Sequence, residues 1–348
     1  MDQVIRIGLD TSKRLFQLHG VDAAERVVLK RKLSRSAMEA FFARLPPTLV
    51  VLEACGASHH WARVLTAMGH DVRLIAPQLA KPYVKRGKND AADAEALCEA
   101  AGRPSMRFVP MKSAGQQADL MLAGMRERLG RRRTQLANTI RGYGAEFGHV
   151  GAKGAAHVRP LLETVQDDPE IPPLAREMFA ELALELAELE ERLCAIEVRL
   201  KAWHLANEAS RRLAEVAGIG PIIATTLVMK TPHPEAFRSG RDFAAWIGLT
   251  PKDHSTAGKT RLGRITRAGD ETLRSLLVVG ATAVVWQVRR GKARRPMPWL
   301  TSLLARKPPK LAAIALANKL ARIAWALLAR GGRYRTSDAR PEACPAAA

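Results

Sequence analysis

Residues 48–54 read "TLVVLEA", a short apolar run that closes on Glu53. An uninterrupted apolar run of this length is typical of a β-strand that is covered on both faces, as strands of parallel sheets are. The preceding Pro46 and Pro47 break any helix that approaches from the N-terminal side. This stretch therefore predicts a sheet that is layered between helices.

The sequence on either side of this run predicts a mixed sheet. Upstream, three short apolar or alternating runs are separated by turn-like residues and read as consecutive strands: "VIRIGLD" (4–10), "RLFQLHGVD" (14–22) and "RVVLKRKL" (26–33). Downstream, "HHWARVLTAMG" (59–69) predicts a helix and "DVRLIAP" (71–77) predicts a fifth strand. Three strands followed by alternating helix and strand indicate an α/β domain.

Charge points to a polyanionic partner. The 348 residues include 55 Lys and Arg against 34 Asp and Glu, a formal net charge of +21, which attracts nucleic acid. No run of about 18 uncharged apolar residues occurs, and the N-terminus continues into a strand pattern, so we expect a cytoplasmic protein without a membrane segment. The four cysteines are far apart and contain no C-x-x-C pair, so they indicate neither a zinc site nor a disulfide framework.

After Asp93 the pattern is helical almost to the C-terminus. A basic helix is predicted over 116–148, and 172–204 is rich in Glu, Leu and Ala at helical spacing. The second segment predicts a coiled coil or antiparallel helical stalk, with an ordinary amphipathic helix as the alternative. Residues 213–230 resemble a helix-hairpin-helix, and 254–269 predict a polar, basic loop.

Four carboxylates stand at positions that favour a metal site. Asp10 and Glu53 end predicted strands, while Asp90 and Asp93 open a predicted helix in "KNDAAD" (88–93). Acids at neighbouring strand ends and at i, i+3 on a helix can converge, and two Mg²⁺ ions there would serve phosphodiester exchange. In the structural alternative, Asp90 is an N-cap with Asp93 as its capping-box partner, Asp10 is a turn residue and Glu53 a helix-start acid.

Six motifs resemble one family along most of the chain. "GLDTSK" (8–13), "LEACGASHHWAR" (52–63) and "KNDAADAEALCEA" (88–100) resemble segments of the DEDD transposases of bacterial insertion sequences, the IS one-ten family and its IS eleven-eleven branch. "VAGIGPIIATTL" (216–227), the segment 243–277 and "NKLARIAWALL" (318–328) resemble the second conserved domain of that family. The motifs follow the family order between Val4 and Leu328.

The resemblance implies a fold and a division of the chain. It implies a RuvC-like, RNase H-type α/β catalytic domain over 1–150 and a coiled-coil stalk over 151–208. A mainly helical transposase domain would follow over 209–330, and we expect a disordered tail over 331–348. The DEDD tetrad then falls on Asp10, Glu53, Asp90 and Asp93 as the Mg²⁺ ligands.

The same resemblance implies a serine nucleophile in "PKDHSTAGK" (251–259), where Ser255 is the candidate and Thr256 and Ser239 are lesser ones. A serine hydroxyl would conserve the phosphodiester energy as a phosphoserine bond, although a serine in a polar loop is more commonly a turn residue. Ala257 stands where the family commonly has glycine, and His254 reads as a phosphate contact or an exposed side chain.

The resemblance also implies partners: donor and target DNA, a guiding bridge (seeker) RNA, and a homo-oligomer of two to four chains in which the serine of one subunit meets the carboxylates of another. The arginine clusters at 126–133 and 289–296 are expected to contact phosphates. Two alternatives remain from the residues. A Holliday-junction-resolvase-like nuclease would use water as the nucleophile, and a binding protein would use none of these groups for chemistry.

Overall fold

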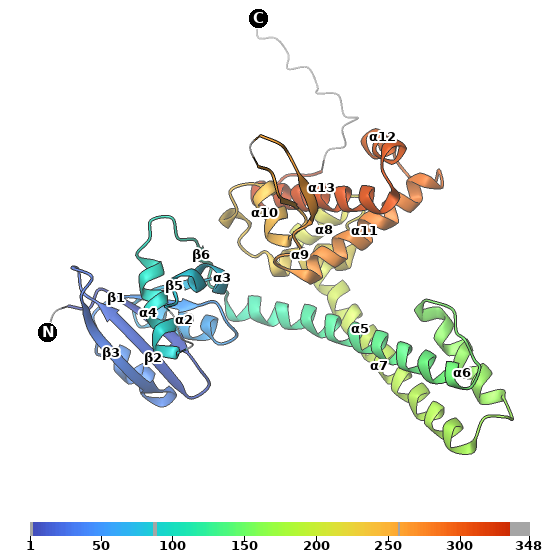
Figure 1. Ribbon diagram of the computed structural model, residues 1–348, viewed down its shortest axis with the longest axis horizontal. Helices are drawn as coiled ribbons and strands as arrows, with labels where there is room; N and C mark the ends of the chain where they lie inside the picture. Colours follow the sequence, from blue (N-terminus) through green and yellow to red (C-terminus); the bar gives the residue numbers. More distant parts are fainter. Residues whose placement is uncertain (1–2, 86–88, 257, 335–348) are drawn as a thin grey trace, which may run out of the picture. The chain divides into compact units, whose positions relative to one another are not determined.

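The computed structural model describes residues 3–85, 89–256 and 258–334. The chain divides into two compact units, Met1–Gln117 and Ala118–Ala348, which appear in Figure 1 as the blue-to-cyan part and the green-to-red part. The last helix ends at Arg330. Residues 335–348 of the expected disordered tail lie outside the described residues.

The first unit contains the predicted mixed sheet. The five predicted strands form as β1 (Arg6–Thr11), β2 (Leu15–Val21), β3 (Val27–Ser34), β4 (Leu49–Glu53) and β5 (Asp71–Ile75). A two-residue strand that the sequence did not indicate, β6 (Phe108–Val109), completes the order β3-β2-β1-β4-β5-β6. The pairs β1–β4 and β4–β5 are parallel and the others antiparallel.

Helices cover both faces of this sheet, as the apolar run in β4 requires. On one face, α1 (Met38–Phe42) and α2 (Ser58–Ala67) pack over a core that includes Leu52 and Trp61. On the other face, α3 (Pro77–Ala80) and α4 (Asp90–Ala101) pack against a core that includes Val51 and Leu97. Because neighbouring residues of a strand point to opposite faces, β4 contributes to both cores.

Two long helices dominate the first part of the second unit. They are α5 (Ala114–Glu146), which begins in the first unit, and α7 (Pro173–Ala206); the shorter α6 (Val158–Asp167) lies between them in sequence. All three share one hydrophobic core, in which Ile140 and Val165 are fully buried. Arg126 and Arg132 of α5 form ion pairs with Glu197 and Glu185 of α7.

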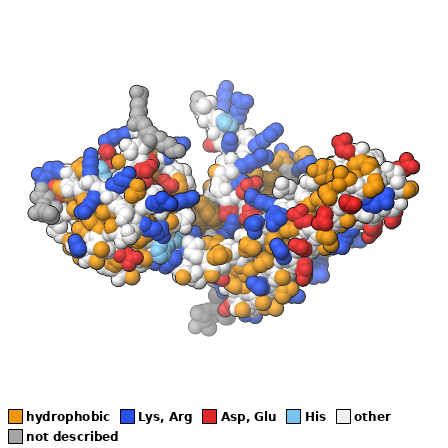
Figure 2. Space-filling model, turned by 90° about the horizontal axis from the view of Figure 1, so that it is seen from below, with side chains coloured by type: hydrophobic (Ala, Val, Ile, Leu, Met, Phe, Trp, Pro, Cys, Tyr) orange, Lys and Arg blue, Asp and Glu red, His pale blue; other side chains and the backbone are white. Residues whose placement is uncertain are grey.

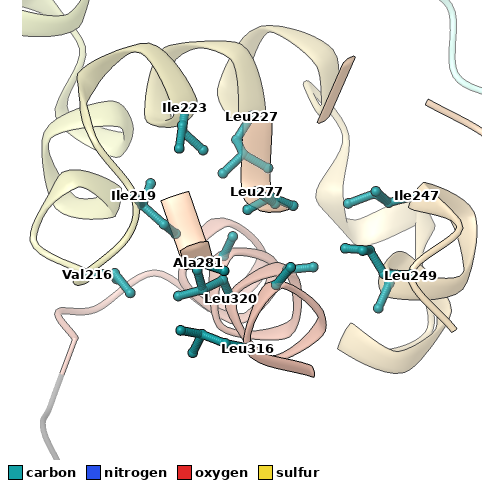
Figure 3. Close-up of a cluster of buried hydrophobic side chains, with 14 of the residues drawn as sticks. Val216, Ile219, Ile223, Leu227, Ile247, Leu249, Leu277, Ala281, Leu316 and Leu320 are labelled. Atoms are coloured by element: carbon teal, nitrogen blue, oxygen red, sulfur yellow. The ribbon is translucent and has the colours of Figure 1, made fainter. Parts of the chain in front are cut away.

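The rest of the second unit is a helical domain around a second core. Its helices are α8 (Glu208–Ala214), α9 (Pro221–Lys230), α10 (Gly240–Ile247), α11 (Glu271–Arg289), α12 (Pro298–Arg306) and α13 (Pro309–Arg330). Figure 3 shows the side chains of Ile223, Leu277 and Leu320 converging from three of these helices. Among the described residues, α13 alone has the length and hydropathy of a membrane-spanning helix, and half of that stretch is buried in the protein.

The prediction of a polar loop over 254–269 is wrong in part. Strands β7 (Pro251–Asp253) and β8 (Leu262–Ile265) pair antiparallel and make a small β-hairpin whose connecting loop carries Ser255. Both strands are short and exposed, and their polar, glycine-containing sequences lack the apolar alternation that would have indicated strands.

Candidate metal centre

The sheet register places Asp10 and Glu53 beside each other. Leu9 of β1 pairs with Leu52 of the parallel strand β4, so the next residue of each strand is an acid at the carboxyl end of the sheet. Gly8 pairs with Val51, and each of them lies two residues before one of these acids. Residues two apart in a strand point to the same face of the sheet, so Gly8 and Val51 lie on the face that carries the acids. That face is the one covered by α4, as the contacts of Gly8 show.

Gly8 allows α4 to approach the sheet closely. A Cβ at this position would lie 2.0 Å from the carbonyl oxygen of Ala94 and 2.6 Å from the backbone nitrogen of Cys98. A glycine inside a strand commonly marks such an approach. The absence of a side chain at Gly8 thus sets the distance between β1 and the first turns of α4, where Asp90 and Asp93 lie.

The first turn of α4 shows that the capping alternative for Asp90 is wrong. Asn89 is the N-cap, and its side chain accepts a hydrogen bond from the Ala91 N–H at 3.0 Å. Asp90 and Asp93 instead lie inside the first turn, three residues apart on one helical face. Their carboxylates are favoured there by the positive end of the helix dipole, and neither is needed to satisfy the helix start.

Three of the four predicted ligands converge. Asp10, Asp90 and Asp93 each offer a carboxylate oxygen, and these oxygens lie within 4.8 Å of one another. Burial, followed by the charges of Asp90, Asp93 and Glu53, raises the pKa of Asp10 from 3.8 to about 6. Burial and then the charge of Asp93 raise the pKa of Glu53 as well. Glu53 is therefore electrostatically part of the cluster, although it is outside the tightest group.

The donor set fits a divalent cation. Hard carboxylate oxygens suit Mg²⁺, which takes few protein ligands and keeps several waters. Burial first, and then the neighbouring carboxylates, disfavour the negative charge of Asp10 and raise its pKa, and a bound cation would offset both effects. All three converging side chains are at least partly accessible, so the cluster is open to a solvent-borne ion and to a substrate.

His59, near the same loop, has a structural role. Its Nδ1 accepts a hydrogen bond from the Lys112 N–H at 3.2 Å, and its ring is buried. Burial, followed by the charges of Lys112 and Arg63, lowers the pKa of His59 to about 4. The imidazole is therefore neutral at pH 7 and fixes the segment around Lys112 against α2.

The three candidate nucleophiles differ in what their hydroxyls do. Ser239 is the N-cap of α10, and its Oγ accepts from the Asp242 N–H at 3.2 Å. Thr256 is exposed and forms a single β-bridge with Lys259. The Oγ of Ser255 is exposed and accepts from the Arg261 N–H at 3.0 Å.

Asp253 is a neighbour of Ser255 that the sequence pattern did not single out. The Ser255 N–H donates to Asp253 Oδ1 at 2.8 Å. Hydrogen bonds from the side chain and the backbone of Ser255 lower the pKa of Asp253 below its usual range. The spacing of an acid two residues before a loop serine was the available signal, since Asp commonly bonds the backbone two residues on.

The two arginine clusters differ in their ion pairs. In 126–133, Arg126, Arg131 and Arg132 each form an ion pair with a glutamate. In 289–296, no described carboxylate lies within ion-pair distance of Arg289, Arg290, Lys292, Arg294 or Arg295. Between Thr272 and Tyr334 the sequence has no Asp or Glu at all.

Comparisons with known proteins cover both units. A family model described as "Transposase IS116/IS110/IS902 family" matches residues 210–296, and a DEDD transposase model matches 7–143. A putative transposase of Sinorhizobium fredii is 62% identical over 98% of this chain and 88% of its own length. A probable family 20 transposase of Pseudomonas aeruginosa is 50% identical, over 95% of this chain and 98% of its own. The transposase for insertion sequence element IS1111A of Coxiella burnetii is 37% identical, over 96% and 92%.

Proposed function

The chain belongs to the IS116/IS110/IS902 family of transposases, and from this membership we propose that it exchanges DNA strands by metal-assisted transesterification through a phosphoserine intermediate. The observation that carries the proposal is the convergence of the Asp10, Asp90 and Asp93 oxygens within 4.8 Å. Asp10 lies near the end of a strand of the mixed sheet, and Asp90 and Asp93 lie at the start of a helix that covers it. The segment that matches the DEDD model, 7–143, includes all three acids.

The four carboxylates are proposed as ligands for two Mg²⁺ ions. Bound there, the ions would supply Lewis-acid stabilisation of the attacking and leaving oxygens in an in-line displacement. The protein positions these ligands. Strands β1 and β4 hold Asp10 and Glu53 at their carboxyl ends, and the first turn of α4 carries Asp90 and Asp93. The raised pKa of Asp10 supports a need for positive charge at this point.

Ser255 is proposed as the nucleophile. In the step, Ser255 Oγ attacks the phosphorus and gives up its proton to solvent, one P–O ester bond breaks, and the leaving DNA oxygen takes up a proton from solvent to become a hydroxyl. A second DNA hydroxyl then attacks the phosphoserine and restores the serine, so no external energy source is needed. Support comes from the exposure of Ser255 and from Asp253, which accepts a hydrogen bond from the Ser255 N–H and so holds the loop around the serine.

Partners and assembly are further parts of the proposal. Donor and target DNA and a guiding bridge RNA would contact the basic surface, with unpaired cations such as those in 289–296 as phosphate contacts. Helix α7 is proposed as the coiled-coil stalk of a dimer or tetramer, and α8–α9 as a helix-hairpin-helix-like phosphate contact. We propose a functional division into the catalytic domain 1–150, the stalk 151–208 and the helical domain 209–330.

One assay separates this mechanism from its alternatives. The protein is incubated with labelled insertion-sequence DNA, guide RNA and Mg²⁺, and a protease-sensitive covalent protein–DNA adduct is sought. We expect an adduct from the wild type and from Ser239→Ala, because Ser239 only caps α10. We expect none from Ser255→Ala or Asp10→Asn.

The alternatives give different results in the same assay. Strand cleavage that survives Ser255→Ala but not Asp10→Asn would indicate a hydrolytic nuclease similar to a Holliday-junction resolvase, with water as the nucleophile. An adduct that survives Ser255→Ala and disappears in Thr256→Ala would move the nucleophile by one residue. DNA binding with neither adduct nor cleavage would indicate a binding protein.

A further inference from the structure

An open basic cavity lies along the β7–β8 hairpin and the residues that follow it. The cavity has a volume of about 340 Å³ and is lined by Lys252, His254, Arg264, Ile265, Thr266 and Arg267. Neither Ser255 nor Asp253 lines it. Lys252 lies in β7 and His254 directly follows that strand, and both line the same pocket. The His254 ring lies against Gly263, where a Cβ would be 3.2 Å from it.

The positive charge in this cavity is not neutralised by the described part of the chain. None of the described carboxylates forms an ion pair with Lys252, Arg264 or Arg267, whereas Arg126, Arg159 and Lys230 of the same unit each pair with an acid. The nearby acids are engaged elsewhere. Asp253 holds Ser255, and Asp270 accepts from Lys230 Nζ at 2.8 and 3.0 Å.

Arg267 has a backbone conformation that is uncommon for a residue other than glycine. Its φ is +57°, in the left-handed region that favours glycine. The conformation is held by the Arg267 N–H, which donates to the Gly248 carbonyl at 3.2 Å, and by Arg274, which donates to the Ala268 carbonyl at 3.1 Å. Glycine would adopt this conformation without strain, and non-glycine residues with such a φ tend to occur at functional sites.

We propose that this cavity binds a backbone phosphate of the DNA strand that Ser255 attacks, with Arg267 as its principal contact. The inference rests on the proposed function, because it assigns the phosphate to DNA from the position of the cavity on the hairpin that carries Ser255. Arginine suits a phosphate because its planar guanidinium can donate two parallel hydrogen bonds. A contact to a phosphate beside the reacting one fixes the strand without reading its sequence.

The test is the salt dependence of DNA binding, measured with EDTA present so that no cleavage occurs. Each phosphate that a protein neutralises adds about 0.9 to the slope of log K against log salt concentration for duplex DNA, and about 0.7 for single strands. Arg267→Gly removes the guanidinium, and glycine adopts the positive φ of this position without strain. We therefore expect the magnitude of the slope to fall by the amount due to one phosphate, while the Tm does not fall. Arg267→Lys should restore most of the slope. Lys201→Ala, an equal charge change on α7, should leave it unchanged.

The outcomes separate this site from the mechanism it serves. A changed slope in Arg267→Gly for guide RNA but not for DNA would overturn the assignment to the DNA strand. An unchanged slope for both, with a normal covalent adduct, would overturn the phosphate site while the proposed mechanism stands. If Arg267→Gly reduces the slope for DNA but the wild-type protein forms no covalent adduct, the phosphate site is supported and the phosphoserine mechanism is contradicted.

Discussion

Asp10 is the residue whose environment departs most from that of an ordinary surface acid. Its pKa is raised from 3.8 to about 6 in the folded chain. Between about pH 4 and 6 the folded state holds a proton that the unfolded state has released. The free energy of unfolding of the metal-free protein therefore falls as the pH rises through this window. Because Asp10 is half-buried, solvent screens part of this effect. We expect the charge of Asp10 to lower the free energy of unfolding by about 1–2 kcal/mol at pH 7.

Asp10→Asn should relieve that repulsion. In EDTA at pH 7.5, we expect the variant to unfold at a temperature a few degrees above the wild type, with the difference vanishing below about pH 4. Thermal denaturation followed by circular dichroism between pH 4 and 8 measures this. A variant that unfolds at or below the wild-type temperature at pH 7.5 would show that the charge of Asp10 is not disfavoured in the folded state.

The roles of single residues were only partly predictable. The types and order of the four acids indicated a metal site, because carboxylates at strand and helix ends have few other common uses together. Which residue caps α4 depends on φ and ψ at one position, and the sequence "ND" offers two good caps, Asn89 and Asp90. The role of Arg267 was also hidden, because its left-handed backbone depends on contacts with Gly248, which is distant in sequence.

At the scale of elements, the position of α4 on β1 determines the geometry of the acidic cluster. Gly8→Ala would place a Cβ 2.0 Å from the Ala94 carbonyl oxygen, so α4 must shift. We expect a loss of about 1–3 kcal/mol in the free energy of unfolding and a loss of divalent-metal affinity. Gly56→Ala is the matched control, since a Cβ there meets no atom within 4 Å.

Chemical denaturation and a Mn²⁺ titration of both variants check this prediction. If Gly8→Ala binds Mn²⁺ and unfolds as Gly56→Ala does, the close approach of α4 does not position the acids.

The elements that were predicted are those with strong local signals. Strands β1 to β5 and the long helices α5 and α7 have clear apolar patterns, and all of them form. Strand β6 has two residues, too few to show a period. The hairpin β7–β8 is exposed and basic, so its pairing depends on backbone bonds such as that from the His254 N–H to the Arg261 carbonyl rather than on an apolar pattern.

At the scale of the whole molecule, the α6–α7 end of the second unit exposes apolar surface. Hydrophobic and acidic side chains gather there in Figure 2. A groove of about 710 Å³ is lined by residues that include Tyr143, Leu174 and Met178, which are at least half exposed. Apolar surface rimmed by charge commonly marks an interface between proteins, which agrees with the proposed oligomer.

Met178→Glu should therefore reduce self-association. We expect a smaller molar mass than the wild type by light scattering at equal concentration, because a charge in the groove would be desolvated on assembly. Val279→Glu, at an exposed apolar residue of α11 outside the groove, is the control. Equal masses for Met178→Glu and the wild type would place the subunit contact elsewhere.

The net charge of +21 predicted a nucleic-acid partner without showing how the charge is distributed. The structure shows that part of the basic sequence, in 126–133, pairs with glutamates of α7, while the hairpin and the stretch after Trp286 have no such partners among the described residues. Whether a basic residue is paired depends on which helices pack together, and a count of charges cannot predict it.

The most direct test of the metal centre is calorimetric titration of the full chain with Mn²⁺ at pH 7.5. The wild type should bind two ions, and Asp10→Asn, Glu53→Gln, Asp90→Asn and Asp93→Asn should each lose at least one of them while keeping the wild-type circular dichroism spectrum. Wild-type protein that binds no Mn²⁺, or four folded variants that bind it as the wild type does, would contradict the assignment of these carboxylates as the metal centre.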